Sequence, residues 1–176
     1  YSILLIAEAF CDVAINSGPL MTREQAFDSA QVALTKAIEL LTPVTGANAV
    51  EALSLTRMAR IGRARVALNL GNKAGVLAEA PNIPEGFIRN AERADVSAQT
   101  RNLIWEGMRV NSLSATESYY NGPANEGLRV GSVIDPRVPV QHIGLGVGAD
   151  GLTDVWRALK YRQRGSPIPF ATWREM

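Results

Sequence analysis

Aromatic side chains are concentrated in the second half of this 176-residue chain, where six of its seven Trp and Tyr residues lie beyond residue 100. A flat ring with a polar edge can stack on the apolar face of a sugar, while neighbouring Asn, Arg and Asp side chains bond the sugar hydroxyls. The pattern therefore predicts a ligand-binding surface. Its alternative is that the rings cover the ends of a helical core. The candidate ligand-binding residues are Trp105, Tyr119, Tyr120 and Trp156.

The composition disfavours enzymes that depend on thiol or imidazole chemistry. Cys11 and His142 are the only residues of their types, so a zinc cluster or a hydrolytic triad lacks partners. Glu8 and Asp12 fall four residues apart on a polar helix face, where like charges are typical of exposed positions. We expect no catalytic residues, no metal and no cofactor. We also expect Cys11 to be a small buried hydrophobe and His142 a structural hydrogen-bonding residue.

Two short segments contain residues typical of ligand-binding loops, but each lacks an acidic residue that the complete motif requires further along the chain. Residues 144–149 match a dinucleotide fingerprint, yet that motif needs an acidic residue about 20 positions later, and a basic stretch follows instead. We expect a flexible glycine loop there. Asp150, Thr153 and Asp154 offer oxygen atoms to a hard cation, but no distal Glu completes a calcium loop, so we expect a solvated turn.

Arginines cluster within one predicted helix. Guanidinium groups at this spacing either pair with carboxylates and carbonyls of packed neighbours or form an anion site, and we favour the pairing interpretation. The formal net charge of +1 does not favour a nucleic-acid partner. The clustered residues are Arg57, Arg60, Arg63 and Arg65.

Helical periodicity dominates residues 1–80, which contain only five of the fifteen glycines and two of the nine prolines. Thr22 and Gln25 form a capping box before the second helix, and Pro81 ends the fourth. The helices make two hairpins of a tetratricopeptide-like kind, although the first and third begin roughly 47 residues apart instead of the usual 34. The predicted helices cover residues 3–14, 22–41, 48–70 and 73–80.

Residues 81–176 show no sustained period. Loops rich in Gly, Pro and Asn separate short candidate elements, and such loops are where binding residues usually lie. We therefore expect a mainly α fold with a helical scaffold over residues 1–80 and a loop-rich part over 81–176. The short candidates are a strand or helix at 102–110, a helix at 112–120, and strands at 138–143 and 155–161.

Several short motifs occur in a recognisable order along nearly the whole chain. They are LIAEAFC at residues 5–11, AQVALTKAI at 30–38, ARIGRAR at 59–65, LNLG at 68–71, AEAPNIP at 78–84, DPRVPV at 135–140, KY at 160–161, PIP at 167–169 and WREM at 173–176. In this order they resemble the SusD/RagB family of outer-membrane nutrient-uptake lipoproteins, in particular its SusD-like branch.

The resemblance implies a fold of tetratricopeptide-like hairpins with an irregular loop-rich subdomain. It also implies a non-catalytic, surface-exposed protein of the outer membrane that binds an oligosaccharide or another nutrient and works with a TonB-dependent, SusC-like transporter. Family members carry an acylated Cys at their start and further helices at their end, so we expect this chain to be a segment of a longer one. Cys11 lies within a predicted helix and is not that anchor.

A second function remains open at this point. A helical-repeat scaffold could use the groove between its hairpins to hold a protein partner, without any small ligand. Both hypotheses predict a rigid helical first half. They differ in what the aromatic residues of the second half do, since only the nutrient-binding hypothesis gives Trp105 and Tyr120 a ligand to contact.

Overall fold

The computed structural model describes residues 1–109, 129–130, 133–134, 140–144, 152 and 155–176. These residues are mainly helical, as the sequence predicts. The chain divides into two compact units, which we name the first unit (Tyr1–Asn90 with Pro169–Met176) and the second unit (Ala91–Ile168). The composition changes near Pro81, about ten residues before the first unit's long segment ends at Asn90. The last residues of the chain, from Pro169, belong to the first unit again.

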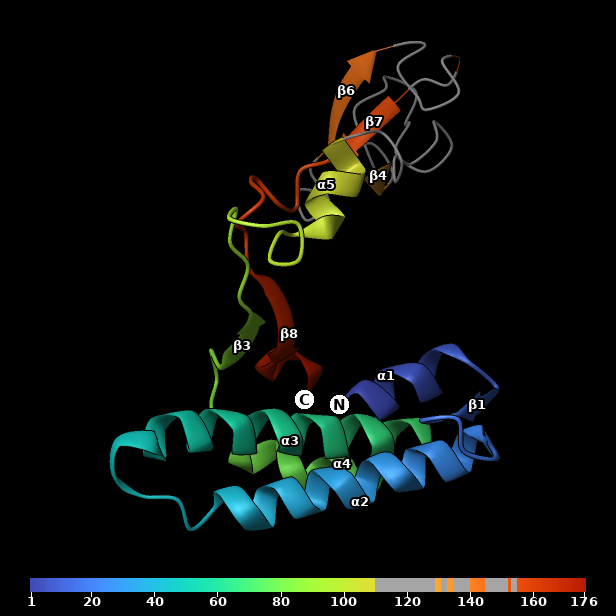
Figure 1. The fold of residues 1–176 in the computed structure, drawn as a ribbon, viewed down its shortest axis with the longest axis vertical. Helices are drawn as coiled ribbons and strands as arrows, with labels where there is room; N and C mark the ends of the chain where they lie inside the picture. Colours follow the sequence, from blue (N-terminus) through green and yellow to red (C-terminus); the bar gives the residue numbers. More distant parts are fainter. Residues whose placement is uncertain (110–128, 131–132, 135–139, 145–151, 153–154) are drawn as a thin grey trace. The chain divides into compact units, whose positions relative to one another are not determined.

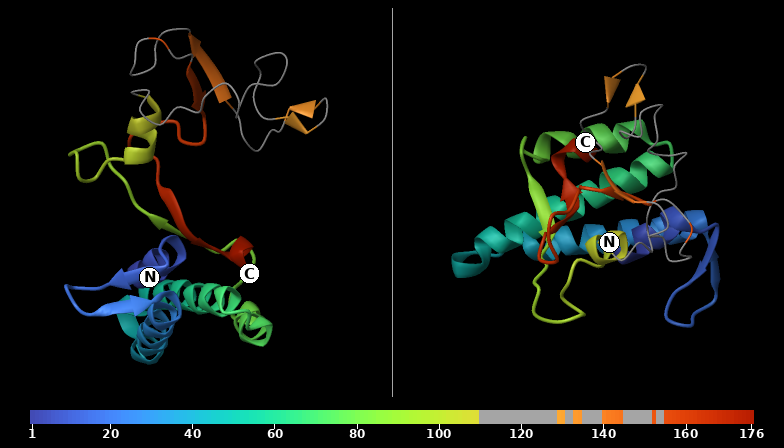
Figure 2. Two further views of the ribbon diagram at one scale, coloured as in Figure 1. Left: turned by 90° about the vertical axis from the view of Figure 1, so that its right-hand side faces the viewer. Right: turned by 90° about the horizontal axis from the view of Figure 1, so that it is seen from above.

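Three helices form the centre of the first unit. They are α2 (Arg23–Leu41), α3 (Ala49–Asn69) and α4 (Lys73–Glu79), with α3 packed against both neighbours (Figure 1, Figure 2). The short 3-10 turns η1 (Gly46–Asn48) and η2 (Ala80–Asn82) precede α3 and follow α4. The helical class is therefore established, whereas the tetratricopeptide-like character of the hairpins stays a proposal.

Local signals account for the start and the orientation of α2. The Thr22 hydroxyl accepts a hydrogen bond from the Gln25 backbone N–H at 3.3 Å, and the Gln25 side chain accepts one from the Thr22 N–H at 2.9 Å. This capping box satisfies two amides that the first helical turn leaves without partners. The helical periodicity is also confirmed, because the buried residues of α2 recur at helical spacing and are Ala26, Phe27, Ala30, Leu34 and Ile38.

Small residues let α3 lie close to its neighbours. A Cβ at Gly62 would stand 3.0 Å from Leu34 Cδ1, so a larger residue at this position would push α2 and α3 apart. Gly71, with φ of +71°, allows the chain to leave α3 in the left-handed region. The Asn72 side chain then accepts a hydrogen bond from the Gly75 N–H at 2.9 Å and begins α4.

The first predicted helix is wrong beyond Ala9. Helix α1 covers Ser2–Ala9, and the chain then forms an antiparallel hairpin of β1 (Asp12–Ala14) and β2 (Leu20–Thr22), in which Val13 lies opposite Met21. Val13 fits the helical stripe by spacing, but it is buried equally well as the inward residue of a short strand. The connecting turn contains two non-glycine residues at positive φ, Asn16 and Ser17.

Two strands close the first unit. β3 (Ile88–Ala91) pairs with β8 (Ile168–Thr172), which leads into the 3-10 turn η3 (Trp173–Glu175). Ala171 is fully buried with Ile61 and Ile83 in a second apolar cluster. The last residues of the chain therefore pack against α3, which the sequence pattern did not predict.

The second unit contains one described helix and two short hairpins. Helix α5 (Leu103–Arg109) shows that the helical alternative for residues 102–110 is correct. β4 (Arg129–Val130) pairs with β5 (Val133–Ile134), and β6 (Val140–Gly144) pairs with β7 (Val155–Ala158). The predicted strands at 138–143 and 155–161 are thus confirmed over these parts. The helix predicted at 112–120 lies outside the described residues.

Candidate functional site

A buried asparagine positions Trp105 at the start of α5. Asn102 is fully buried, and its side-chain oxygen accepts a hydrogen bond from the Trp105 N–H at 3.0 Å. The same side chain donates to the Ser166 carbonyl at 2.9 Å, and the Asn102 N–H donates to the Arg164 carbonyl at 2.8 Å. Asn102 therefore caps α5 through the Trp105 N–H and also connects the start of this helix to a segment more than sixty residues later.

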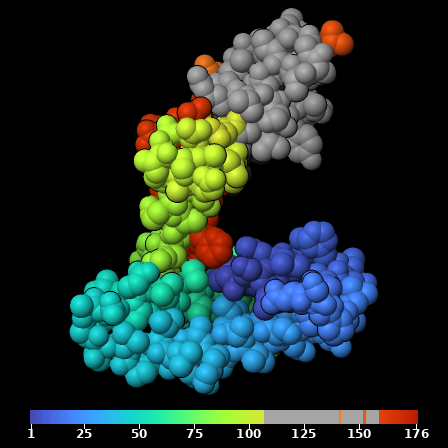
Figure 3. Space-filling model, viewed as in Figure 1, coloured from blue at the N-terminus to red at the C-terminus, as the bar shows by residue number. Residues whose placement is uncertain are grey.

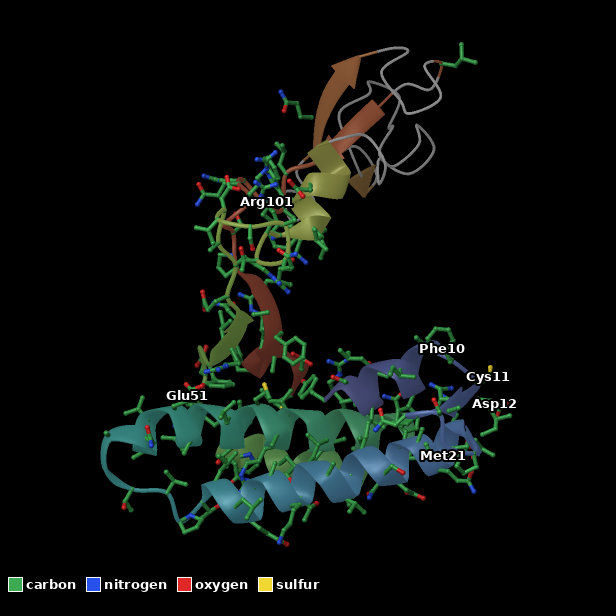
Figure 4. All side chains as sticks on the ribbon, in the orientation of Figure 1. Phe10, Cys11, Asp12, Met21, Glu51 and Arg101 are labelled. Atoms are coloured by element: carbon green, nitrogen blue, oxygen red, sulfur yellow. The ribbon has the colours of Figure 1, made fainter. Side chains whose placement is uncertain are left out.

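Two arginines and two carboxylates form an ion-pair network that reaches the half-buried Trp105 through Arg164. The Arg164 guanidinium lies 5.7 Å from the indole centroid, and its Nε is 2.9 Å from Glu106 Oε1. Arg101 Nε is 2.9 Å from Asp95 Oδ1, and Arg101 Nη1 is 3.6 Å from Glu106 Oε1 (Figure 4). The two guanidinium groups thus share the same carboxylates. This network holds the charged groups at fixed positions beside the ring.

The arrangement has the chemistry of a recognition surface. One face of the indole interacts with the Arg164 guanidinium, a cation–π contact that also limits the movement of both groups. The surrounding carboxylates accept hydrogen bonds and the guanidinium groups donate them, which is what a polyhydroxylated ligand requires. The Trp105 side chain is half-buried, and Asp95 is exposed.

Of the other nominated residues, the described part of the structure places only the backbone of Trp156, in a strand that contacts α5. Trp156 lies in β7, where its backbone is paired with His142 of β6. The side chains of these two residues are outside the described part of the structure, and so are Tyr119 and Tyr120 altogether. Tyr161, which was not nominated, is buried with Lys160 Nζ 5.6 Å from its ring centroid.

The polar residues that interact with Trp105 were not identified from the sequence. Asn102 carries a recognisable signal, because Asn is a preferred residue immediately before a helix. Arg164 carries none, since it is far from Trp105 in sequence and approaches it only through the fold, and Asp95 joins the network through the two arginines. The nominated ring was therefore chosen without the charged groups that define its surroundings.

The pairing interpretation is confirmed for Arg60, Arg63 and Arg65 but not for Arg57. Glu79 is buried and binds two of them, with Arg60 Nη1 at 3.0 Å and Arg63 Nη2 at 2.6 Å. Arg57 instead lies 5.8 Å from the centroid of the Phe87 ring. These contacts fix α4 and the following segment on α3.

Arg65 joins three segments of the first unit. It forms an ion pair and hydrogen bonds with Glu8 of α1, and its Nη1 lies 3.2 Å from Glu175 Oε2 of η3. Burial would lower the pKa of Arg65, but hydrogen bonding to Glu8 and the nearby Tyr1 raise it above its ordinary value. Burial, reinforced by the Glu175 carboxylate, raises the pKa of the Tyr1 phenol to about 12. Glu8 is therefore a partly buried structural partner and not the solvated acid that the sequence predicts.

The remaining sequence predictions concern Cys11, His142 and the residues from 144 to 154. Cys11 is exposed between α1 and β1, so the prediction of a buried hydrophobe is wrong (Figure 4). The reason is the early end of α1, which removes the helical face that would have buried the thiol. The His142 side chain, most of the glycine loop at 144–149, and Asp150, Thr153 and Asp154 lie outside the described residues.

The described residues contain neither a cluster of metal ligands nor a membrane-spanning helix. No three His, Cys, Asp or Glu side chains among them are grouped so that they could hold a metal ion. Within the same part of the chain, no helix has both the length and the apolar character needed to cross a bilayer. Comparison with known proteins finds no matching family model, curated protein or solved structure.

Proposed function

We propose that this protein is a non-catalytic nutrient-binding protein of the outer-membrane surface, with a SusD-like fold of tetratricopeptide-like hairpins. It binds an oligosaccharide or another nutrient and passes it to a TonB-dependent, SusC-like transporter. The order of the short motifs in the sequence and the mainly helical fold support this proposal. Attachment to the membrane through a lipid anchor on the longer parent protein is part of it.

The observation that carries the proposal is the environment of Trp105. A half-buried indole beside Arg164, with Glu106 and Asp95 in the same network, combines an apolar stacking surface with donors and acceptors. Tryptophan and arginine are the residues that most often dominate binding energies when they are partly shielded from water. Removal of the ring is therefore expected to weaken binding by about 2 kcal/mol or more, which is roughly a thirtyfold loss of affinity.

Titration calorimetry against a panel of oligosaccharides tests the proposal. The full chain is expected to bind at least one of them, and Trp105→Ala is expected to weaken that binding roughly thirtyfold. Trp173 provides a matched control, because its ring also lies close to a guanidinium, that of Arg174 at 5.8 Å, but in the first unit. Trp173→Phe is expected to bind as the unmodified chain does.

Two results would count against the proposal. If a folded parent protein binds no oligosaccharide or peptide, the nutrient-binding function is wrong. If Trp105→Ala keeps full affinity for a bound oligosaccharide, the site lies elsewhere. Capture of a protein partner that survives Trp105→Ala, without any small-ligand binding, would favour the helical-repeat scaffold instead. Circular dichroism of each variant establishes that it is folded.

A further inference from the structure

A hollow of about 390 Å³ opens in the first unit where α2 ends and α3 begins. It is lined by residues of both helices and of the segment that connects them, together with Asn82 after α4. Figure 3 shows the first unit from the side on which α2 and α3 run across the view. A volume of this size is within the range of small-molecule sites. It lies within the first unit and includes none of the residues around Trp105.

One wall of the hollow is aliphatic. Leu41, Val44 and Leu53 line it, and Leu53 is 49% exposed. The Thr56 hydroxyl, which also lines the hollow, donates to the Ala52 carbonyl at 2.8 Å. The Leu41 carbonyl accepts a hydrogen bond from the Val44 N–H at 3.1 Å. The wall therefore offers apolar surface whose nearby polar groups already have partners.

The other wall is cationic. Arg57 and Arg60 line it, one helical turn apart on α3. Arg60 shares the Glu79 carboxylate with Arg63, so two guanidinium groups are neutralised by one acid. Arg57 forms no ion pair with any residue in the described part of the chain, and its guanidinium carbon lies 5.8 Å from the centroid of the Phe87 ring. The hollow consequently carries an excess of positive charge.

The nearest acid on α3 does not compensate this charge. Glu51 accepts hydrogen bonds from Arg89 at 2.7 and 2.8 Å. This pairing lowers the pKa of Glu51 and keeps the carboxylate engaged with β3. Among the described residues, no acceptor binds the Arg57 hydrogen-bond donors, and an anion is the acceptor that a guanidinium binds most strongly.

We propose that this hollow binds a small aliphatic carboxylate. Its carboxylate accepts hydrogen bonds from Arg57, and its hydrocarbon chain lies on Leu41, Val44 and Leu53. The charge of Arg57 selects for an anion, and aliphatic walls without an aromatic platform favour a hydrocarbon chain over a sugar. This site is independent of the proposed nutrient-binding site, because it lies in the other unit and does not use Trp105.

Calorimetric titration of the full chain with octanoate tests this proposal, with octylamine and octanol as matched ligands. Octanoate is expected to bind saturably, octylamine not to bind, and octanol to bind at least tenfold more weakly, because only the carboxylate makes a charge-assisted hydrogen bond. Arg57→Gln is expected to weaken octanoate binding about tenfold or more for the same reason. Arg174→Gln is the control, since it removes an exposed arginine that also lies against an aromatic ring.

Several results would overturn the proposal. They are the absence of octanoate binding, equal binding of octanol, or undiminished octanoate binding by Arg57→Gln. Val44→Asp gives a second test in case the first variant is poorly folded, because Val44 lies between helices and a carboxylate there would compete for Arg57. It is expected to abolish octanoate binding. Trp105→Ala is expected to bind octanoate normally, and a loss there would refute the independence of the two sites.

Discussion

Removal of the Arg65 side chain should destabilise the first unit more than removal of any exposed cation. Arg65→Met keeps most of the apolar stem but leaves Glu8 and Glu175 without their shared guanidinium. The side chains of these acids are only 23% and 27% exposed. Breaking a fully buried ion pair costs about 3–5 kcal/mol, whereas breaking an exposed one costs about 0–1 kcal/mol. For this partly buried group we expect about 2–3 kcal/mol.

The matched control is Lys36→Met, which breaks the exposed ion pair between Lys36 and Glu39 within α2. Those side chains are 65% and 59% exposed, so the expected cost is below about 0.5 kcal/mol. Urea unfolding followed by circular dichroism measures both variants. A loss of 2–3 kcal/mol lowers the midpoint by roughly 1 M or more, at the m-values typical of a small unit. Equal midpoints for the two variants would refute the role given to Arg65.

Three further predictions concern other groups. Thr22→Ala removes the side-chain half of the capping box and is expected to cost about 1 kcal/mol in urea unfolding, whereas Thr22→Ser should cost much less. Asn102→Ala leaves two part-buried hydrogen-bonding groups unpaired, the Trp105 N–H and the Ser166 carbonyl, and is expected to cost the second unit about 2 kcal/mol. The loss should be seen as faster proteolysis between residues 91 and 109, and unchanged proteolysis would contradict it. The raised pKa of Tyr1 means that the folded state favours the neutral phenol. The stability that Tyr1 contributes is therefore complete below pH 10 and is lost as the pH rises through about 12. Tyr1→Phe should flatten this part of the pH–stability curve.

The sequence could predict those features that depend on neighbouring residues. Helix α2 could be predicted because its capping box and its helical periodicity lie within one short segment. The helices α3 and α4 have comparable signals at Gly71 and Asn72. In each case the hydrogen bonds that fix the element join residues a few positions apart, so the pattern contains the needed information.

Other features depend on contacts between distant residues. Nothing near Val13 distinguishes a buried helical position from the inward position of a strand, and the pairing with Met21 decides it. Cys11 is exposed for the same reason, because the helix ends at Ala9 and the strand begins at Asp12. The acids that bind Arg65 come from both ends of the chain, and no local pattern identifies them.

The candidate site shows the same division. Trp105 could be nominated from its residue type and from the concentration of aromatic residues around it in sequence. Its neighbours Arg164 and Asp95 could not, because a network of this kind exists only once α5 is tied to the 164–166 segment through Asn102. The chemistry of the ring was therefore predictable, whereas the charged groups that complete the surface were not.

The most direct measurement of the proposed function is the nuclear magnetic resonance signal of the Trp105 indole N–H during titration with the oligosaccharide panel. The three tryptophans give three such signals, each assigned by substitution. We predict that the Trp105 signal shifts saturably with at least one oligosaccharide while the Trp173 signal stays in place. An unchanged Trp105 signal throughout a titration in which an oligosaccharide demonstrably binds would contradict the assignment of the binding surface to this residue.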